Sequence, residues 1–241
     1  MSQNTNQIPQ HIVLFPDGNR RWARKKGIDT LKGHMEGYKN LKRFCRWCQK
    51  REIKVITAFG FSTENWNRSP REVNYLMKLF EKGLKEGLKA YKEKDKEAQL
   101  FGDKVRFRVI GQKEKLPKPL QQIVKKAEDI TKNNTEYFLN LAVSYGGRWD
   151  IMQAVKKIIR RKIPAEKINE ELFGNYLSTA GIPEPDLIIR PSGEKRLSNF
   201  LLWQGAYSEI YFCDKLWPDF TEKDLDLALE EYARRQRRFG K

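Results

Sequence analysis

Cysteine, histidine and long apolar runs are all scarce in this sequence. Its 241 residues include three cysteines and two histidines. An odd cysteine count in a chain of this size argues against a disulfide framework and for a reducing compartment. Cys45 and Cys48 form a C-x-x-C pair inside an amphipathic helical pattern. Without a second pair, this spacing does not favour a zinc or redox site.

No apolar run is long enough for a transmembrane helix, and the N-terminus has no signal-peptide pattern. Residues 1–10 are mostly polar, so we expect a flexible N-terminus followed by a cytoplasmic domain. A hydrophobic content of 39% with 12% aromatics is that of a folded chain rather than a disordered one.

Basic residues exceed acidic residues by a wide margin. The sequence contains 48 lysines and arginines against 31 aspartates and glutamates, a net charge of +17. Such a charge favours nucleic acid, an anionic membrane surface or a phosphorylated substrate. Because the basic residues are spread along the chain without a recognition motif, we expect no nucleic-acid partner. Peripheral contact with an anionic membrane is retained as a hypothesis.

Short apolar runs alternate with amphipathic stretches from residue 11 to the end of the chain. The expected strands cover residues 11–15, 54–59, 105–110, 137–143, 187–189 and 210–212. The expected helices cover residues 20–26, 33–51, 71–90, 117–132, 148–161 and 165–178, with a last one from 221. This alternation predicts a single α/β domain over residues 11–241, with a mainly parallel six-stranded sheet flanked by helices.

The stretch 186–209 places polar groups after the fifth expected strand. Arg190 ends an apolar run, and the turn that follows carries Arg196 and Ser198, with Glu209 further on. Ligands of parallel α/β sheets bind at the carboxyl ends of the strands, and paired guanidinium groups match diphosphate oxygens. The stretch therefore predicts an anion site, although taken alone it is equally compatible with an ordinary basic surface loop.

The loop after the first expected strand has the layout of a phosphate site. Gly18 allows a tight turn, and Arg20 and Arg21 add positive charge at the start of the next helix. Asp17 would repel a phosphate unless a cation lay between them, and Mg²⁺ is the usual bridge. The loop carries neither the G-x-x-x-x-G-K-[ST] nor the G-x-G-x-x-G signature. An Asx-Gly turn that caps the helix explains it equally well without a ligand.

Two further polar segments accompany these loops. His34 stands near the expected start of a helix, where it is either a phosphate donor or a packing residue. Residues 62–68, STENWNR, follow the second expected strand. Asn65 is a candidate for holding water or a substrate proton and Arg68 for holding an anion, whereas a turn network covered by Trp66 is the alternative.

Taken together, these segments resemble the cis-prenyltransferases of the undecaprenyl or dehydrodolichyl diphosphate synthase type. The matching pieces occur in family order over nearly the whole chain. They are DGNRRWA (17–23), GHMEG (33–37), FSTENWNR (61–68), YGGRWDI (145–151), DLIIRPSGEKRLSNFLLWQGAYSEIYF (186–212) and RRFG (237–240). The stretch at 186–212 is the most specific of them.

The resemblance implies a Mg²⁺-dependent homodimeric enzyme. Such an enzyme condenses isopentenyl diphosphate with an allylic diphosphate of the farnesyl or geranylgeranyl type, making a medium- or long-chain Z-polyprenyl diphosphate for lipid-carrier synthesis. The implied allylic diphosphate site is Gly18, Asn19, Arg20, Arg21, Trp22 and His34. The implied isopentenyl diphosphate site is Arg190, Arg196, Ser198, Arg238 and Gly240. The implied catalytic residues are Asp17 and Asn65, the reaction centre adds Ser62, Trp66, Arg68 and Glu72, and the metal ligands are Asp17 and Glu209.

Some positions depart from the common family pattern. Thr30 stands where an arginine is usual, Pro16 and Arg20 alter the first loop, and Pro191 follows Arg190. A non-catalytic subunit on the same fold is disfavoured because Asp17 and the other site residues are present.

The sequence also supports an expectation about the length of the product. We expect an apolar tunnel beside the helices at 33–51 and 73–91. Gly60 is small where a bulky residue would close it, and the segment after Ala90 is long. Both favour a medium or long product, and a short-chain or irregular prenyl diphosphate synthase is the alternative.

Overall fold

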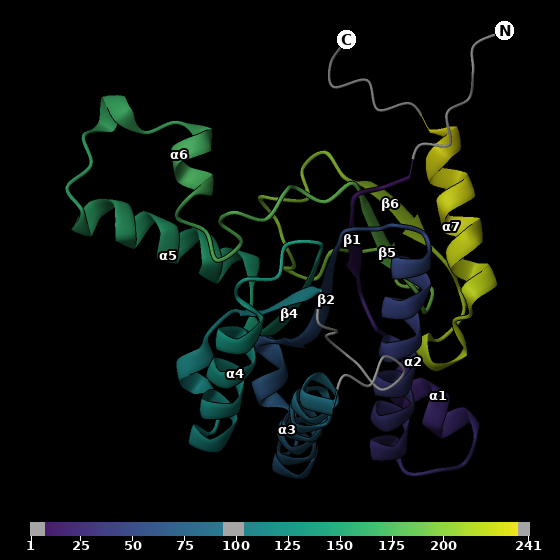
Figure 1. Ribbon diagram of the computed structural model, residues 1–241. Coiled ribbons are helices and arrows are strands. Elements are labelled where there is room, and N and C mark those ends of the chain that lie inside the picture. The colour runs from purple at the N-terminus through teal and green to yellow at the C-terminus, as the bar shows by residue number, and fades with distance from the viewer. Residues whose placement is uncertain (1–7, 94–103, 236–241) are drawn as a thin grey trace, which may run out of the picture.

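The computed structural model describes residues 8–93 and 104–235. Its centre is a six-stranded sheet in the order β3-β4-β2-β1-β5-β6, and every described pairing is parallel (Figure 1). The strands are β1 (His11–Leu14), β2 (Val55–Ser62), β3 (Val105–Ile110), β4 (Tyr137–Tyr145), β5 (Leu187–Arg190) and β6 (Glu209–Phe212). The prediction of a six-stranded, mainly parallel α/β sheet is confirmed.

Alternating side chains along β1 divide the core into two layers. Ile12 and Leu14 point into the larger cluster, whereas Val13 and Phe15 belong to a smaller cluster on the opposite face. Both sets are almost fully buried, as expected for a parallel sheet covered on both sides.

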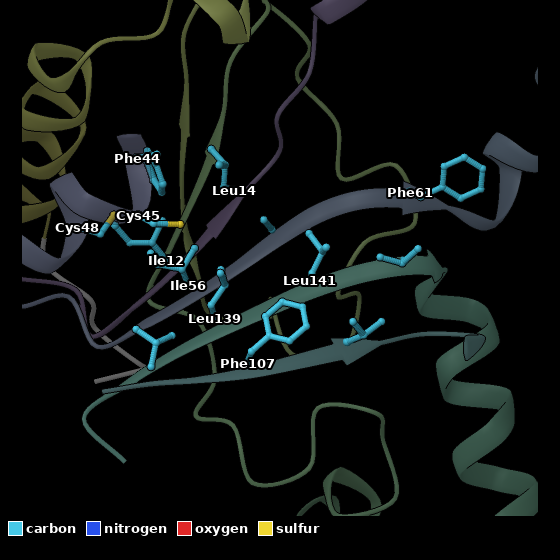
Figure 2. Close-up of a cluster of buried hydrophobic side chains, with 14 of the residues drawn as sticks. Ile12, Leu14, Phe44, Cys45, Cys48, Ile56, Phe61, Phe107, Leu139 and Leu141 are labelled. Atoms are coloured by element: carbon cyan, nitrogen blue, oxygen red, sulfur yellow. The ribbon is translucent and has the colours of Figure 1, made fainter. Parts of the chain in front are cut away.

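The larger cluster is covered mainly by four helices. They are α2 (Thr30–Lys50), α3 (Pro70–Glu93), α4 (Lys118–Thr131) and α7 (Glu222–Arg234). Figure 2 shows Phe44, Cys45 and Cys48 of α2 packed over the strands. Burial raises the pKa of Cys45 to about 12 and that of Cys48 well above its ordinary value. Both thiols therefore act as apolar core groups, which accords with the structural interpretation of the C-x-x-C pair.

The smaller cluster contains Phe200 and Leu201 from the segment after β5, and Trp149 of α5 (Gly147–Arg160) packs against it. The two remaining α-helices are short: α1 (Asn19–Lys25) follows β1, and α6 (Glu170–Gly174) follows α5. Figure 1 shows α5 and α6 projecting away from the layer that contains α2, α3 and α4.

Two predicted helices differ from the structure. The helix predicted from residue 33 begins at Thr30, because the Asp29 side chain caps it by accepting the Leu31 N–H at 2.9 Å. The helix predicted over 165–178 is wrong: residues 165–167 form a 3₁₀ turn and α6 covers only five residues. Asn169 interrupts the helix with an extended backbone, and its side chain caps α6 through the Leu172 N–H at 2.8 Å.

The amino edge of the sheet contains a buried polar network. His11 Nδ1 lies 2.7 Å from the Pro183 carbonyl oxygen, and His11 Nε2 lies 2.8 Å from Thr57 Oγ1. Since a carbonyl can only accept, Nδ1 carries the proton and Nε2 accepts from the Thr57 hydroxyl. Thr57 Oγ1 in turn accepts from Asn140 Nδ2 at 3.1 Å. Every ring nitrogen of His11 is therefore paired without a charged partner on the ring.

Candidate active site

A cavity of about 840 Å³ opens at the carboxyl edge of the sheet, between the strand ends and helices α2 and α3. This lies at the upper end of the range of about 300–1,000 Å³ typical of ligand pockets. One part of its wall is charged and polar, with Asp17, Arg20, Arg21, Arg24, His34, Asn65, Arg68, Arg190, Glu194, Arg196 and Ser198. The other part is apolar, with Leu41, Phe61, Leu76, Leu79, Phe80, Leu84 and Leu141. The cavity therefore fits an amphipathic ligand with an anionic head and a hydrocarbon tail.

Asp17 lies just beyond the carboxyl end of β1 in a tightly turned loop. Its Oδ1 accepts the Gly18 N–H at 2.6 Å, and its Oδ2 lies 3.0 Å from Arg190 NH2. Gly18 has a φ of +91°, and a Cβ there would lie 2.8 Å from Leu216. Only glycine fits this position, so the loop conformation is fixed locally.

Arg190 at the end of β5 is only 4% exposed. Its guanidinium donates to Ser198 Oγ at 2.9 Å and to the Arg196 carbonyl, and it stacks on the Phe15 ring at 4.7 Å. The buried Nε of Arg190 has no hydrogen-bond partner among the described residues. A buried guanidinium with an unused donor is costly unless a ligand supplies an acceptor, so this geometry favours anion binding.

The segment after Arg190 holds several residues in left-handed backbone conformations. Ser192, Ser198, Asn199 and Leu201 all have positive φ, between 45° and 85°. Such conformations cost about 1–3 kcal/mol each and occur most often at functional sites. They place Ser192 and Ser198 where both hydroxyls meet arginine side chains.

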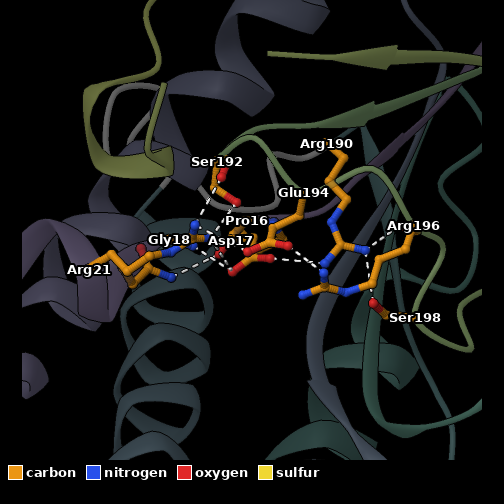
Figure 3. Close-up of polar contacts among 10 residues, drawn as sticks. Pro16, Asp17, Gly18, Arg21, Arg190, Ser192, Glu194, Arg196 and Ser198 are labelled. Atoms are coloured by element: carbon orange, nitrogen blue, oxygen red, sulfur yellow. Dashed lines mark hydrogen bonds and ion pairs between the residues drawn. The ribbon is translucent and has the colours of Figure 1, made fainter. Parts of the chain in front are cut away.

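Arg21 connects the first loop to this segment. Its NH1 donates to the Ser192 carbonyl at 3.0 Å and its NH2 to Ser192 Oγ at 2.8 Å. Arg21 NH1 also lies 3.1 Å from Glu194, whose carboxylate pairs with Arg196 as well. Figure 3 shows Arg21 and Arg190 approaching Asp17 from different sides, with Glu194 between the two loops. The structure thus joins the two anion sites that the sequence predicts separately.

Glu72 of α3 is the centre of a second, buried network. Its Oε1 lies 2.9 Å from Arg68 NH1 and 3.0 Å from His34 Nε2, and its Oε2 lies 3.5 Å from Arg20 NH1. Burial lowers the pKa of His34, so the imidazole is neutral at neutral pH. Its single N–H then points to Glu72, and Nδ1 is an acceptor. His34 is therefore unsuited to donate to a phosphate in this arrangement, contrary to one interpretation of its position.

Ser62 and Asn65 form a reciprocal cap on the short 3₁₀ turn Thr63–Asn67. Ser62 Oγ accepts the Asn65 N–H at 3.2 Å, and Asn65 Oδ1 accepts the Ser62 N–H at 3.1 Å. Asn65 also lines the cavity. Because its carbonyl oxygen is used in the cap, the amide NH₂ is the group left for a ligand. That group donates hydrogen bonds and cannot accept a proton.

Three predicted site residues have side chains engaged in contacts with the scaffold. Trp66 packs against the core and donates from Nε1 to Ser144 at 2.9 Å, and Trp22 donates from Nε1 to Asp219 at 2.7 Å. Neither indole is part of the cavity wall. Asn19 lines it, but its Nδ2 is bound to the Pro16 carbonyl and its Oδ1 is wedged against Gly37 of α2. The direction of these side chains was not readable from the sequence.

Glu209, the predicted second metal ligand, does not meet Asp17 within one chain. It is the first residue of β6 and pairs with Leu187, whereas Arg190, the partner of Asp17, pairs with Phe212. Three residues of a parallel strand span about 10 Å, and Asp17 lies beyond the opposite edge of the sheet. The Glu209 carboxylate is bound by Arg235 at 2.8 Å.

Asp17 remains the carboxylate suited to a metal in this chain. No group of three or more metal-ligating side chains occurs among residues 8–93 and 104–235. Mg²⁺ is commonly held by one or two carboxylates together with substrate phosphates. The donor set therefore fits a magnesium ion that arrives with a diphosphate, and it does not fit a resident metal held by protein groups alone.

Gly60 lines the cavity near its apolar end. A Cβ at this position would lie 3.1 Å from Leu141 and 3.3 Å from Phe80. The absence of a side chain at Gly60 therefore lets Leu141 and Phe80 approach this position closely. Residues 94–103, in the segment whose length favours a long product, lie outside the described residues, as do Arg238 and Gly240.

Sequence reasoning missed several residues at the charged end. Arg24, Glu64, Glu194 and Asn199 line the cavity, and Ser192 binds Arg21. Glu194 lies inside the family-like stretch 186–212, but a charged residue in a loop carries no pattern that shows its partners. Its proximity to Arg21 depends on how two loops 171 residues apart pack, which the Arg21–Ser192 contact shows.

The fold and the cavity define a class of α/β protein with an anion site and an apolar pocket at one sheet edge. A model of the putative undecaprenyl diphosphate synthase family matches residues 15–240. The chain is 44% identical over 98% of its length to the ditrans,polycis-undecaprenyl-diphosphate synthase of Legionella pneumophila strain Paris, described as specific for (2E,6E)-farnesyl diphosphate, and covers 97% of that protein. It is also 44% identical to the geranylgeranyl-diphosphate-specific tritrans,polycis enzyme of Thermoplasma volcanium, over 97% of this chain and 89% of that one.

A solved structure of a related enzyme has the same fold. Lavandulyl diphosphate synthase from Lavandula x intermedia, determined with dimethylallyl diphosphate, superimposes with a TM-score of 0.89 at 37% identity over 97% of this chain and 99% of that one. This chain belongs to the undecaprenyl diphosphate synthase family of prenyltransferases.

Proposed function

We propose that this protein condenses isopentenyl diphosphate with an allylic diphosphate to make a Z-polyprenyl diphosphate. The observation that carries the proposal is the buried, partly unsatisfied guanidinium of Arg190 beside Asp17, at the charged end of a cavity whose other end is apolar. Family membership and the farnesyl- and geranylgeranyl-specific relatives support the same reaction.

In the proposed reaction the allylic C1–oxygen bond breaks and the diphosphate leaves with the electron pair. C4 of isopentenyl diphosphate then bonds to C1, and a proton is lost from C2. Arg20 and Arg21 are placed to bind the leaving diphosphate, and Arg190, Arg196 and Ser198 are placed to bind the diphosphate of isopentenyl diphosphate. Guanidinium groups held in position stabilise the charge that develops on the leaving group.

The remaining polar groups orient the substrates and hold the arginine side chains in position. The Asn65 NH₂ donates to a diphosphate oxygen, while Glu72 fixes Arg20 and Arg68. In this proposal, the proton lost from C2 goes to an oxygen of the departed diphosphate. Mg²⁺, held by Asp17 and diphosphate oxygens, would supply charge neutralisation.

A panel of starters tests the proposal. The purified chain is incubated with labelled isopentenyl diphosphate, Mg²⁺ and dimethylallyl, geranyl, farnesyl or geranylgeranyl diphosphate, and the dephosphorylated products are separated by chromatography. We expect chain elongation from farnesyl or geranylgeranyl diphosphate to a medium or long product. A chain that incorporates no label from any starter would contradict the proposal.

A short-chain or irregular synthase is the second candidate function. The high structural similarity to lavandulyl diphosphate synthase and the close packing of Phe80 over Gly60 favour this candidate. In the same assay, it would give a dominant product of no more than three isoprene units or a branched product from dimethylallyl diphosphate.

We also propose a homodimer and a peripheral contact with anionic membranes. The net charge of +17 supports the membrane contact. Among the described residues, no helix combines the length and the apolarity that a membrane span requires. Sedimentation equilibrium tests the dimer, and co-sedimentation with vesicles of increasing anionic lipid content tests the contact. A monomer, or binding that is independent of anionic lipid, would contradict these two proposals respectively.

A further inference from the structure

Glu194 holds an unusual position for an acidic residue in an anion site. Its carboxylate lies 3.1 Å from Arg21 NH1 and also pairs with Arg196 NH1. Arg21 comes from the loop proposed for the allylic diphosphate, and Arg196 comes from the loop proposed for isopentenyl diphosphate. A single carboxylate therefore neutralises one arginine of each site (Figure 3).

The side chains that form these two pairs are partly accessible to solvent, as are those of the Arg21–Asp17 pair. The side chains of Arg21 and Arg196 are 42% and 61% exposed, and that of Glu194 is 24% exposed. Exposed ion pairs contribute little net stability, so an incoming ligand replaces them at little cost. The Arg190 side chain, by contrast, is 4% exposed and is held by a hydroxyl and a carbonyl as well as by Asp17.

We propose that Glu194 is an internal anion that occupies the arginines of both diphosphate sites in the free enzyme and competes with diphosphate for them. This inference rests on the proposed function. When a diphosphate binds, its oxygens replace the Glu194 carboxylate on Arg21 or Arg196. When inorganic diphosphate leaves after condensation, the carboxylate returns to the arginines and aids the release of that product.

Two consequences follow from the competition. Removing the negative charge of Glu194 frees two guanidinium groups and removes a repulsion, so diphosphate binds more tightly. The same change slows the exchange of product for new substrate, so inorganic diphosphate becomes a stronger inhibitor. A residue that merely supported the loop would produce the opposite result, because its loss would disorder Arg196 and weaken binding.

The test is isothermal titration of the purified full chain with inorganic diphosphate, without magnesium, for the wild type and Glu194→Gln. We expect the dissociation constant to fall about three- to tenfold in the variant, as for the loss of one or two exposed ion pairs. Glu64→Gln is the matched control: Glu64 lines the same cavity, but it accepts from the Asn199 amide at 2.9 Å. The dissociation constant of Glu64→Gln for diphosphate should change less than about twofold, because the described partner of Glu64 is a neutral amide rather than an arginine.

The possible outcomes separate the role of Glu194 from the existence of the anion site. Equal or weaker binding by Glu194→Gln, with a circular dichroism spectrum and a melting temperature like those of the wild type, overturns the role of Glu194 alone. Failure of the wild type and of both variants to bind diphosphate, both in this titration and in its repeat with Mg²⁺, overturns the anion site itself, and the proposed function with it. Product inhibition by diphosphate, measured at fixed substrate, should strengthen in parallel with the binding constant.

Discussion

At the amino edge of the sheet, the imidazole of His11 is held between the Pro183 carbonyl and the Thr57 hydroxyl. At the carboxyl edge, the imidazole of His34 is held by Glu72, with Arg68 and Arg20 on the same carboxylate. The ring nitrogens of His11 are fully paired with neutral groups. Beside the cavity, by contrast, the Nε atoms of Arg20 and Arg190 are buried and have no partner among the described residues.

This contrast separates stability from function. Natural structures pair nearly all buried polar groups, and exceptions call for a reason such as a ligand. The His11 ring follows the general pattern and contributes to folding, although the Asn140 Oδ1 atom of the same network has no partner among the described residues. The carboxyl edge combines unpaired donors, exposed carboxylate–arginine pairs and left-handed backbone, which is the arrangement expected where a substrate completes the site.

The largest effect is expected from Asp17→Asn. The variant keeps the shape and the acceptor for the Gly18 N–H but removes the charge beside Arg190. We expect turnover to fall about 10²–10³-fold, as for other losses of electrostatic stabilisation, and the free energy of unfolding to fall by about 1–3 kcal/mol because the buried Arg190 loses an acceptor. Steady-state assays and thermal denaturation measure both. Turnover near that of the wild type would remove Asp17 from the chemistry.

Glu72→Gln tests the buried network that Glu72 forms at the carboxyl edge of the sheet. The Glu72 side chain is 7% exposed and is shared by three partners, two of them arginines that reach solvent. We expect the free energy of unfolding to fall by about 1–3 kcal/mol, and the KM for the allylic diphosphate to rise. The control is Glu86→Gln, an exposed carboxylate paired with Lys42 and Tyr38. It should cost less than about 1 kcal/mol in urea denaturation.

Because His11 is buried at the amino edge of the sheet, we expect the free energy of unfolding to depend on pH. Burial lowers the pKa of His11 from 6.5 to about 4. Between these values the unfolded chain takes up a proton that the folded protein does not. The stability from neutral His11 is therefore complete above pH 6.5 and is lost as the pH falls toward 4, at up to about 1.4 kcal/mol per pH unit.

Urea denaturation at several pH values measures this slope. Other carboxylates also titrate as the pH falls, so the comparison is made with His11→Gln, in which the His11 contribution disappears. The difference between the two profiles should be confined to pH 4–6.5. Parallel profiles for the wild type and the variant over that range would show that His11 has no such role.

The smallest effect is expected from Trp22→Phe. This change removes the hydrogen bond from Nε1 to Asp219 at the far side of α1. We expect a loss of about 1 kcal/mol in unfolding free energy and no change in the KM for either diphosphate. A large rise in KM with unchanged stability would restore Trp22 to the site in which the sequence places it.

The sequence was sufficient for much of the carboxyl edge. Strand ends marked by Gly18 and Arg190 are local signals, and in a parallel sheet they meet at one edge, as the structure shows. Within one chain Asp17 and Glu209 lie at opposite ends of their strands, because strand register decides which end of β6 a residue occupies.

Other features depend on packing that no local pattern encodes. Whether Trp66 faces substrate or Ser144, and whether Phe80 fills the space above Gly60, is decided by contacts between distant elements. The helix predicted over 165–178 is interrupted because the Asn169 side chain competes for backbone hydrogen bonds.

In the proposed reaction, one cavity holds two diphosphates at once. Calorimetric titration of isopentenyl diphosphate into the chain already saturated with farnesyl thiodiphosphate and Mg²⁺ tests it directly, because the thio analogue binds but ionises slowly. We expect one equivalent of isopentenyl diphosphate to bind per chain without displacing the analogue, and this binding to be lost in Arg196→Ala. Displacement of the analogue, or the absence of any binding to the saturated protein, would contradict it.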